Sequence, residues 1–361
     1  MILDKTGPNP RNDHSGMNMR LISARTLLGL TVTCLLISGA FCQTTRAPSL
    51  QSILNAQAAD LHHDLKGVVV QQHGKTLAEA YFNGDGPTTL HDIRSATKSF
   101  TALLMGIAID RHLVHSVDDP IGRYLPSLKS DVGTTVTIKD LLNMRSGLDS
   151  DDQDPSALGA ESRLDSAPDW AAAAFAVPLK RSPGAKYVYS SLNAFLTGAI
   201  IESTSRMPLD AFAKNELFGP LGIRDFEWRH LPDGHTTGQG NLQITTRDLA
   251  RVGQLMLDGG RASGRQIVPK QWVDESLACQ VTISDVDKYA DCYGYMWYTK
   301  TENVDGHDIL VHFASGNGGN KIYIVPSLDM IVAITSSAYN QPYGQQRSHQ
   351  ILLDVLAATY R

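Results

Sequence analysis

Ser95 and Lys98 lie three positions apart, at the start of a stretch whose apolar residues recur at helical spacing. Side chains three positions apart share one face of a helix, so we expect the Lys98 ammonium beside the Ser95 hydroxyl. Such a neighbour can help to activate a serine as a nucleophile for acyl transfer. Backbone N–H groups at the helix start would favour a developing oxyanion. Since N-capping is the commonest reason for a serine at a helix start, the pair alone is a weak signal.

The S-x-x-K pair gains weight from three segments that follow it in a fixed order. Residues 136–148 read VTIKDLLNMRSGL, residues 183–191 read PGAKYVYSS before a predicted helix, and residues 312–320 read HFASGNGGN between two predicted strands. Ordinary frequencies of serine and lysine give about one S-x-x-K match by chance in a chain of 361 residues. The ordered set is therefore the informative observation.

This set resembles the serine β-lactamase and penicillin-binding superfamily, in its class C-like branch of esterases and peptidases. The resemblance spans about residues 50–361 and is nearest to the aminohexanoate-dimer hydrolase type. The segments that carry this resemblance are IRSATKSF (93–100), YSS (189–191) and GNGG (316–319) followed by IYIVP (322–326). It implies an acylated nucleophile at Ser95, a proton partner at Lys98 and a proton-transferring tyrosine at Tyr189. It implies neither a metal nor a cofactor.

The resemblance also implies where a substrate would bind. The oxyanion hole would consist of the backbone N–H groups of Ser95 and Asn317, with Ser315 and Gly316 on the strand just before Asn317. Ser191 follows Tyr189 at the position where β-lactamases of this branch carry asparagine. Taken singly, Tyr189 could equally be a half-buried structural tyrosine.

A second departure concerns Ala314, which stands where the superfamily carries a lysine or histidine that meets a substrate carboxylate. A methyl group offers no donor, so Ala314 predicts good turnover of neutral short-chain esters and small amides and poor turnover of β-lactams. Arg94, Arg145 or another cation reaching into the site would reverse that expectation, and the sequence leaves this open.

The predicted function is therefore hydrolysis of small esters, amides or peptides through an acyl-enzyme on Ser95. Within the superfamily, a D-amino-acid peptidase or a weak β-lactamase is the alternative, because a fold does not fix a substrate. A non-catalytic, penicillin-binding-like sensor is the alternative outside enzymes. The formal net charge of −5 gives no reason to expect a nucleic-acid partner.

The fold class expected is α/β (α+β), with an antiparallel sheet formed by both chain ends, flanked by helices, and an inserted, mainly helical domain. Lys66–Val70 and Leu77–Phe82 form a predicted hairpin around the turn His73–Lys75. Further strands and a closing helix are predicted at Tyr293–Thr299, Ile309–Phe313, Lys321–Val325, Met330–Thr335 and Gln345–Ala358.

The first 42 residues read as a secretory signal with an upstream extension, and residues 43–361 as the hydrolase domain. Arg20 and Arg25 precede a short apolar run at 27–37, and small residues follow at 38–40. The prediction is an exported, periplasmic or secreted protein, with a membrane partner only if Cys42 is lipidated. Cys279 and Cys292 would then remain in the mature chain, either paired or as two buried thiols.

Overall fold

The computed structural model of the protein describes residues 49–360. The predicted signal and Cys42 lie outside the described residues. Among those that are described, no helix has the length and hydropathy needed to cross a bilayer.

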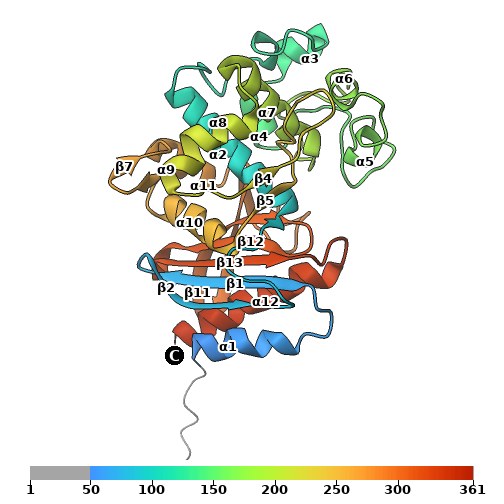
Figure 1. Cartoon of the computed structure of the whole chain (residues 1–361). Helices are drawn as coiled ribbons and strands as arrows, with labels where there is room; N and C mark the ends of the chain where they lie inside the picture. The colour runs from blue at the N-terminus through green and yellow to red at the C-terminus, as the bar shows by residue number, and fades with distance from the viewer. Residues whose placement is uncertain (1–48, 361) are drawn as a thin grey trace, which may run out of the picture. The chain divides into compact units, whose positions relative to one another are not determined.

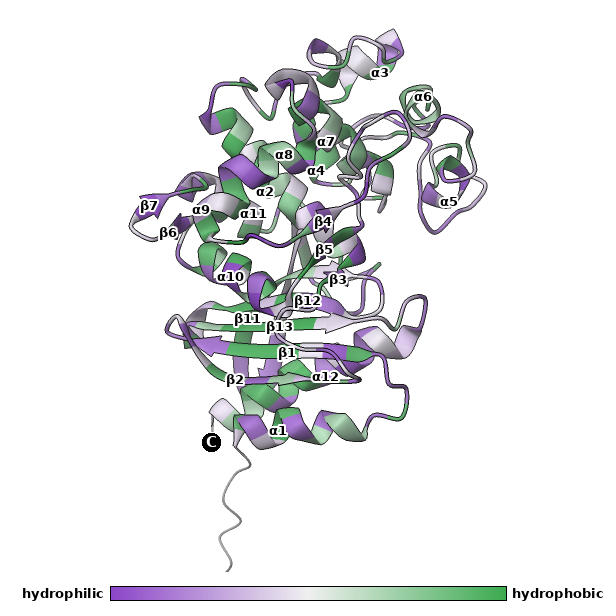
Figure 2. Ribbon diagram, viewed as in Figure 1, coloured by the Kyte–Doolittle hydropathy of each residue, from purple (hydrophilic) through white to green (hydrophobic). Residues whose placement is uncertain are grey.

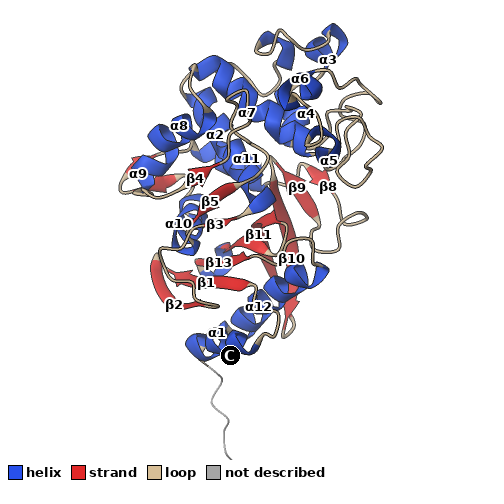
Figure 3. Ribbon diagram, turned by 45° about the vertical axis from the view of Figure 1, so that its right-hand side comes forward, coloured by secondary structure: helices blue, strands red, loops and turns tan. Residues whose placement is uncertain are grey.

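Both ends of the described chain contribute to one antiparallel sheet of eight strands, in the order β2-β1-β13-β12-β11-β10-β9-β8 (Figures 1 and 3). The strands are β1 (Leu65–Gln72), β2 (Lys75–Tyr81), β8 (Val281–Thr282), β9 (Cys292–Gly294), β10 (Trp297–Val304), β11 (His307–Gly316), β12 (Asn320–Val325) and β13 (Met330–Ser336). The predicted sheet from both chain ends is confirmed. All seven residues of β13 are buried, because helices cover this part of the sheet on both faces.

Two smaller sheets lie outside the main one. β3 (His91–Asp92), β5 (Leu242–Ile244) and β4 (Glu227–Trp228) form a three-stranded sheet, and β6 (Arg261–Ala262) pairs with β7 (Arg265–Gln266). The first of these holds the segment that leads into Ser95, because Ile93 N donates to Leu242 O at 3.0 Å.

Most helices lie between β2 and β8, as the inserted helical region predicts. The α-helices are α1 (Leu50–Ala56), α2 (Thr97–Asp110), α3 (Ser130–Thr135), α4 (Ile138–Leu142), α5 (Glu161–Leu164), α6 (Trp170–Phe175), α7 (Ser191–Ser205), α8 (Leu209–Ala213), α9 (Gly219–Leu221), α10 (Thr246–Leu257), α11 (Lys270–Leu277) and α12 (Pro342–Thr359). The short 3₁₀-helices are η1 (Gln57–Ala59), η2 (Arg94–Ala96), η3 (Ile121–Arg123) and η5 (Pro326–Leu328), and η4 (Lys214–Phe218) is a π-helix. Figure 1 shows α1 and α12 on the side of the sheet away from this helical region.

The predicted strand Tyr293–Thr299 is wrong in one respect, because it is two strands. β9 and β10 pair with each other through a tight turn at Tyr295 and Met296, both of which have positive φ (39° and 64°). Contacts from distant residues hold this turn: Tyr295 N donates to Asn143 Oδ1 at 3.2 Å, and Met296 N donates to Leu142 O at 3.1 Å. These bonds offset the cost of left-handed backbone at two non-glycine residues.

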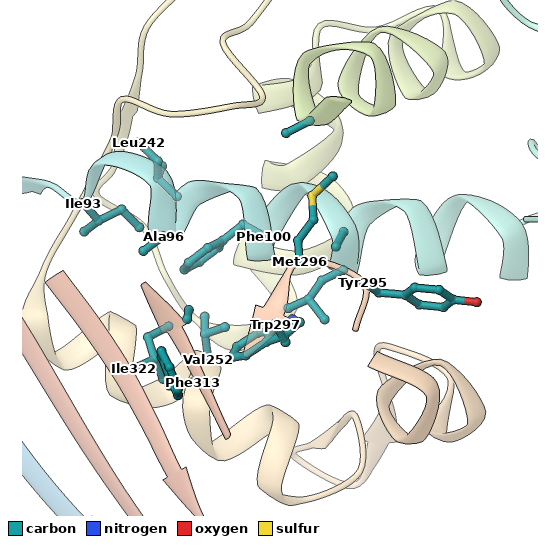
Figure 4. Close-up of a cluster of buried hydrophobic side chains, with 14 of the residues drawn as sticks. Ile93, Ala96, Phe100, Leu242, Val252, Tyr295, Met296, Trp297, Phe313 and Ile322 are labelled. Atoms are coloured by element: carbon teal, nitrogen blue, oxygen red, sulfur yellow. The ribbon is translucent and has the colours of Figure 1, made fainter. Parts of the chain in front are cut away.

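Helix α2 runs through the centre of the described unit and is buried on nearly all sides. Figure 4 shows Phe100 of α2 in one cluster with Val252 of α10 and Ile322 of the sheet. Figure 2 shows the hydrophobic residues concentrated in this helix and in the central strands. A helix packed so completely is a rigid support for any side chain at its first turn.

Candidate active site

Ser95 and Lys98 lie together at the beginning of α2, as their spacing predicts. Ser95 belongs to the short turn η2, and Lys98 lies in the first turn of α2. Lys98 Nζ donates to Ser95 Oγ at 3.0 Å and to the backbone oxygen of Gln239 at 2.8 Å. The side chain is almost wholly buried, so these two acceptors and the helix fix the ammonium against the serine.

The residue before the serine adopts a strained backbone. Arg94 has φ of 53°, in the left-handed region that non-glycine residues avoid. Its guanidinium stacks 4.0 Å from the ring centre of Tyr339, and the backbone N–H of Arg94 donates to Asp92 Oδ1 at 2.8 Å. Such strain persists where surrounding contacts fix it, and it recurs at functional sites. Arg94 is therefore held by Tyr339 and Asp92 instead of reaching into the site.

Tyr189 comes to the same place from a loop that two sequence motifs build together. Val188 N donates to Met144 O at 2.8 Å, which joins the 183–191 segment to the 136–148 segment. Arg145 donates to Gly184 O and is thereby also held away from the site. Lys98 Nζ lies 5.2 Å from the centre of the Tyr189 ring. The three residues assigned to proton transfer and nucleophilic attack are thus brought together.

Two carboxyl groups that the sequence did not single out, those of Asp152 and Glu161, line the same cleft as Tyr189. Asp152 accepts the backbone N–H of Ser191 at 2.7 Å and that of Glu161 at 3.3 Å, and its own N–H donates to Tyr189 O at 3.1 Å. Burial by itself would lower the pKa of Lys98. The electrostatic effects of Tyr189, Glu161 and Asp152 are larger, so the pKa is raised. Burial raises the pKa of Glu161, with Asp152 adding to this and Lys98 opposing it. The ammonium of Lys98 is therefore charged at neutral pH.

The end of β11 packs directly against the turn that carries the serine. A Cβ at Gly316 would lie 2.0 Å from Ile93 O and 3.1 Å from Ala96 N, so only glycine fits. This close approach carries the next residue, Asn317, to the neighbourhood of Ser95. The side chain of Asn317 is engaged with Asn340, through Nδ2 to Oδ1 at 2.7 Å and from Asn340 N at 2.7 Å.

The backbone N–H groups of Ser95 and Asn317 have no hydrogen-bond partner within residues 49–360. Both residues line one cleft. Two N–H groups without a protein partner, at a cleft that contains a serine, are available to a substrate oxygen. This is the arrangement that the sequence predicts for an oxyanion hole.

Ser191 does not take the predicted substrate-binding place. It is fully buried, it begins α7 and it is not among the residues that line the cleft. Its N–H bonds to Asp152, so it positions Tyr189 from behind. The physical cause is that the chain enters α7 directly after Ser190, and this turn carries Ser191 away from the cleft.

Ala314 is also fully buried, on the face of β11 opposite to Ser315. Its register partner is Ile322, which packs on Gly253 of α10. On the other face, Lys321 of β12 lies opposite Ser315, and its Nζ donates to Ser315 Oγ at 2.8 Å. Ala314 provides no cation, but the neighbouring strand β12 provides one in Lys321.

The cleft that joins these residues has a volume of about 900 Å³. Its lining includes Ser95, Glu161, Tyr189, Asp287, Phe313, Ser315, Asn317 and Lys321. A second cavity of about 440 Å³, around Glu202 and His235, shares none of its lining residues. Within the described residues, no cluster of three or more His, Cys, Asp or Glu side chains could hold a metal ion.

Comparison with known proteins identifies the family. Residues 55–356 match the family model described as Beta-lactamase. The chain is 26% identical to the 6-aminohexanoate-dimer hydrolase of Paenarthrobacter ureafaciens over 332 residues, which cover 87% of this chain and 82% of that protein.

Solved structures share the fold. A class C β-lactamase superposes with a TM-score of 0.63 at 15% identity, covering 85% of this chain and 94% of that one. A D-stereospecific amidohydrolase from Streptomyces sp. superposes with a TM-score of 0.61 at 20% identity, covering 83% and 97%. The chain belongs to the β-lactamase family of hydrolases.

Proposed function

We propose that the protein is a serine hydrolase that cleaves ester or amide bonds of small substrates through an acyl-enzyme on Ser95. The observation that carries the proposal is the 3.0 Å hydrogen bond from Lys98 Nζ to Ser95 Oγ, made by a buried lysine at the edge of the cleft. The two free N–H groups beside it favour attack on a carbonyl group, because they can hold the carbonyl oxygen as it becomes negatively charged.

The proton path follows from the charge of Lys98. Since its pKa is raised, the ammonium is already protonated and cannot take the proton of Ser95. Tyr189 then acts as the base in its phenolate form, which the neighbouring ammonium stabilises, and its oxygen takes the Ser95 proton to become a neutral phenol. Ser95 Oγ bonds to the carbonyl carbon, and Tyr189 gives the proton to the departing alcohol or amine.

Deacylation repeats these steps with water. A water molecule gives its proton to Tyr189 and attacks the acyl carbon, and Ser95 Oγ leaves and recovers a proton. The N–H groups of Ser95 and Asn317 would hold the oxyanion in both halves of the reaction. An amide bond is supported as one substrate class by the names of two similar proteins, the aminohexanoate-dimer hydrolase and the D-stereospecific amidohydrolase.

The test is covalent labelling combined with a substrate panel. Purified protein should react with a fluorophosphonate probe at Ser95, located by peptide mass spectrometry, and should turn over nitrophenyl butyrate. The panel adds small amides, D-amino-acid peptides and nitrocefin, which separates the esterase or amidase reading from a peptidase or a weak β-lactamase. Binding of penicillin without turnover of any substrate would indicate a sensor instead.

We also propose that the protein is exported. Cys279 and Cys292 form a disulfide bond, which is typical of oxidising compartments, and this supports the signal predicted at residues 1–42. Fractionation of cells that express the full chain, with N-terminal sequencing of the product, tests this. An uncleaved protein in the cytosolic fraction would contradict it.

A further inference from the structure

Lys321 is a buried cation in the candidate active site that the chemistry above does not use. Its side chain is 3% exposed, yet it lines the same cleft as Ser95 and Tyr189. Within residues 49–360, its three N–H donors make one hydrogen bond, to Ser315 Oγ at 2.8 Å. Lysine is almost never buried without a charged partner, so the position needs an explanation.

The surroundings of Lys321 are aromatic. Its Nζ lies 4.7 Å from the ring centre of Phe313 and 5.8 Å from that of Tyr323. No carboxylate lies within ion-pair distance of Nζ in the described part of the chain, and Asp287 acts on it only from further away. The ring faces favour a cation but do not neutralise it. The ammonium is therefore left available to a negative group in the cleft.

The location of Lys321 connects it to the reacting serine. Ser315, its hydrogen-bond partner, is two residues before Asn317, whose N–H is assigned to the oxyanion hole. Gly316, between them, packs against the turn that carries Ser95. Ser315 points into the cleft, opposite to the buried Ala314. A group bound by Lys321 and Ser315 would thus belong to the same substrate molecule as a carbonyl held at Ser95.

We infer that Lys321 and Ser315 form a carboxylate-binding subsite, so that the preferred substrates are small esters or amides that carry a carboxylate. The inference rests on the proposed serine hydrolase function. The sequence left open whether another cation replaces the one that Ala314 lacks. Lys321 is such a cation, whereas Arg94 and Arg145 are held away from the site. The ammonium comes from the next strand, and it reaches the cleft on the opposite face of β11.

The charge of Lys321 adds a pH signature. Burial lowers the pKa of Lys321 to about 7, with Asp287 opposing the shift. The other titratable group against it, Tyr323, has a pKa raised well above its ordinary value by burial, so it stays neutral. The subsite is cationic below about pH 7 and loses its charge above it. Preference for a carboxylated substrate should fall as the pH rises through this range.

The experiment compares matched esters with and without a carboxylate. One pair is nitrophenyl hexanoate and the mono-nitrophenyl ester of adipic acid, with the anion on the acyl side. The other is nitrophenyl butyrate and the butyryl ester of 5-hydroxy-2-nitrobenzoic acid, with the anion on the leaving group. The measured quantity is the ratio of kcat/KM, anionic over neutral. Chemistry at Ser95 is common to both members of a pair and cancels in the ratio.

Lys321→Met keeps the length of the side chain and removes the charge. We expect it to lower the ratio about ten- to a hundredfold in at least one pair, the scale of a lost charge-assisted hydrogen bond. Lys186→Met removes an exposed lysine at the rim of the same cleft, and its ratio should stay within about threefold because solvent screens that charge. In the unsubstituted protein, the ratio should fall between pH 6 and pH 9, and in Lys321→Met it should be flat.

An unchanged ratio in both pairs, or an equal fall in the Lys186→Met variant, would overturn the subsite. The wild-type ratios need no variant, so a Lys321→Met protein that fails to fold does not remove the test: wild-type protein that prefers the neutral ester of both pairs at pH 6 also overturns it. Failure of the proposed function looks different, because then no ester is turned over and the fluorophosphonate does not label Ser95.

Discussion

The cleft has a buried lysine on each side, and the two lysines differ in charge behaviour. Lys98, on the helical side, is 2% exposed, and Lys321, on the sheet side, is 3% exposed. Burial pushes the pKa of both downwards, yet that of Lys98 is raised and that of Lys321 is lowered to about 7. The same side chain at the same depth therefore reaches opposite outcomes within one site.

Their neighbours account for the difference. Lys98 has Tyr189, Glu161 and Asp152 around it, which compensate for the lost hydration of the ammonium. Lys321 has aromatic rings and a hydroxyl, which compensate less. A lysine whose charge is satisfied inside the protein suits a permanent role in catalysis. A lysine whose charge is incompletely satisfied gains most when a substrate supplies the missing anion.

The largest effect should come from Ser95, the proposed nucleophile, which lies between the two sides of the cleft. Ser95→Ala should lower kcat/KM by about a thousandfold or more for every ester and should abolish fluorophosphonate labelling. Circular dichroism should match that of the unsubstituted protein, because the hydrogen bond that the hydroxyl accepts from Lys98 is local to the start of α2. Labelling that persists at another residue would show that Ser95 is not the nucleophile.

The next effect separates the two lysines. Lys98→Met and Tyr189→Phe should each lower kcat/KM at least about a hundredfold, the scale of lost general acid–base catalysis. The loss should be similar for neutral and anionic esters, so the ratio between them stays within about threefold. This contrasts with Lys321→Met, in which the ratio itself changes. A Lys98→Met variant that loses only anionic substrates would show that the two roles are exchanged.

The disulfide bond belongs to the sheet side. Cys279 and Cys292 are 13 residues apart, and the loop that they close brings Val286, Asp287 and Tyr289 to the cleft. The sequence left pairing and free thiols open, and the structure pairs them. On the chain-entropy model, a loop of this size contributes about 3 kcal/mol to the free energy of unfolding.

The double variant Cys279→Ala/Cys292→Ala should lose that amount in urea unfolding without reductant. The unsubstituted protein should shift in the same direction when reductant is added, whereas the double variant should not respond. Labelling of Ser95 well below the unfolding transition should persist, because η2 and α2 are not part of the loop. Two thiols that alkylate freely in the native, unreduced protein would contradict the bond.

Local patterns were sufficient for many of the elements and for placing Lys98 beside Ser95. The hairpin β1–β2 follows from two apolar runs around a His-Gly turn, and α2 follows from helical spacing after Ser95. The division of Tyr293–Thr299 into two strands could not be predicted, since bonds from Leu142 and Asn143 stabilise its turn. Those partners lie about 150 residues earlier in the chain.

The residues proposed to select the substrate, Lys321 and Ser315, depend on strand register, which the sequence does not specify. Lys321 opposes Ser315 because β11 and β12 meet with Gly316 across from Asn320. A shift of one residue would place Lys321 on the other face of the sheet. A lysine at the start of an otherwise apolar strand was the one signal available. Glu161 had no comparable signal, since it lies in a short helix far along the chain from Ser95.

The smallest predicted effect tests whether the carboxyl group of Glu161 contributes to the raised pKa of Lys98. Burial raises the pKa of Glu161 above its value in the unfolded chain, with Lys98 opposing the shift. The folded protein then holds this proton more tightly than the unfolded chain does, so this group's contribution to stability falls as the pH rises above about 4.5. Glu161→Gln removes the titration. Relative to the unsubstituted protein, it should gain unfolding free energy as the pH rises above about 4.5.

One proton limits that gain to about 1.4 kcal/mol per pH unit, and urea unfolding at several pH values measures it. Glu227→Gln, at an exposed carboxylate of β4, is the matched control for losing one negative charge. A Glu161→Gln variant that loses stability as the pH rises would mean that attraction to Lys98 outweighs burial. In that case the charge of Lys98 would depend mainly on Glu161, and the same variant should also lower kcat/KM for neutral esters. A gain without a loss of activity would assign the stabilisation of Lys98 to Tyr189 and Asp152.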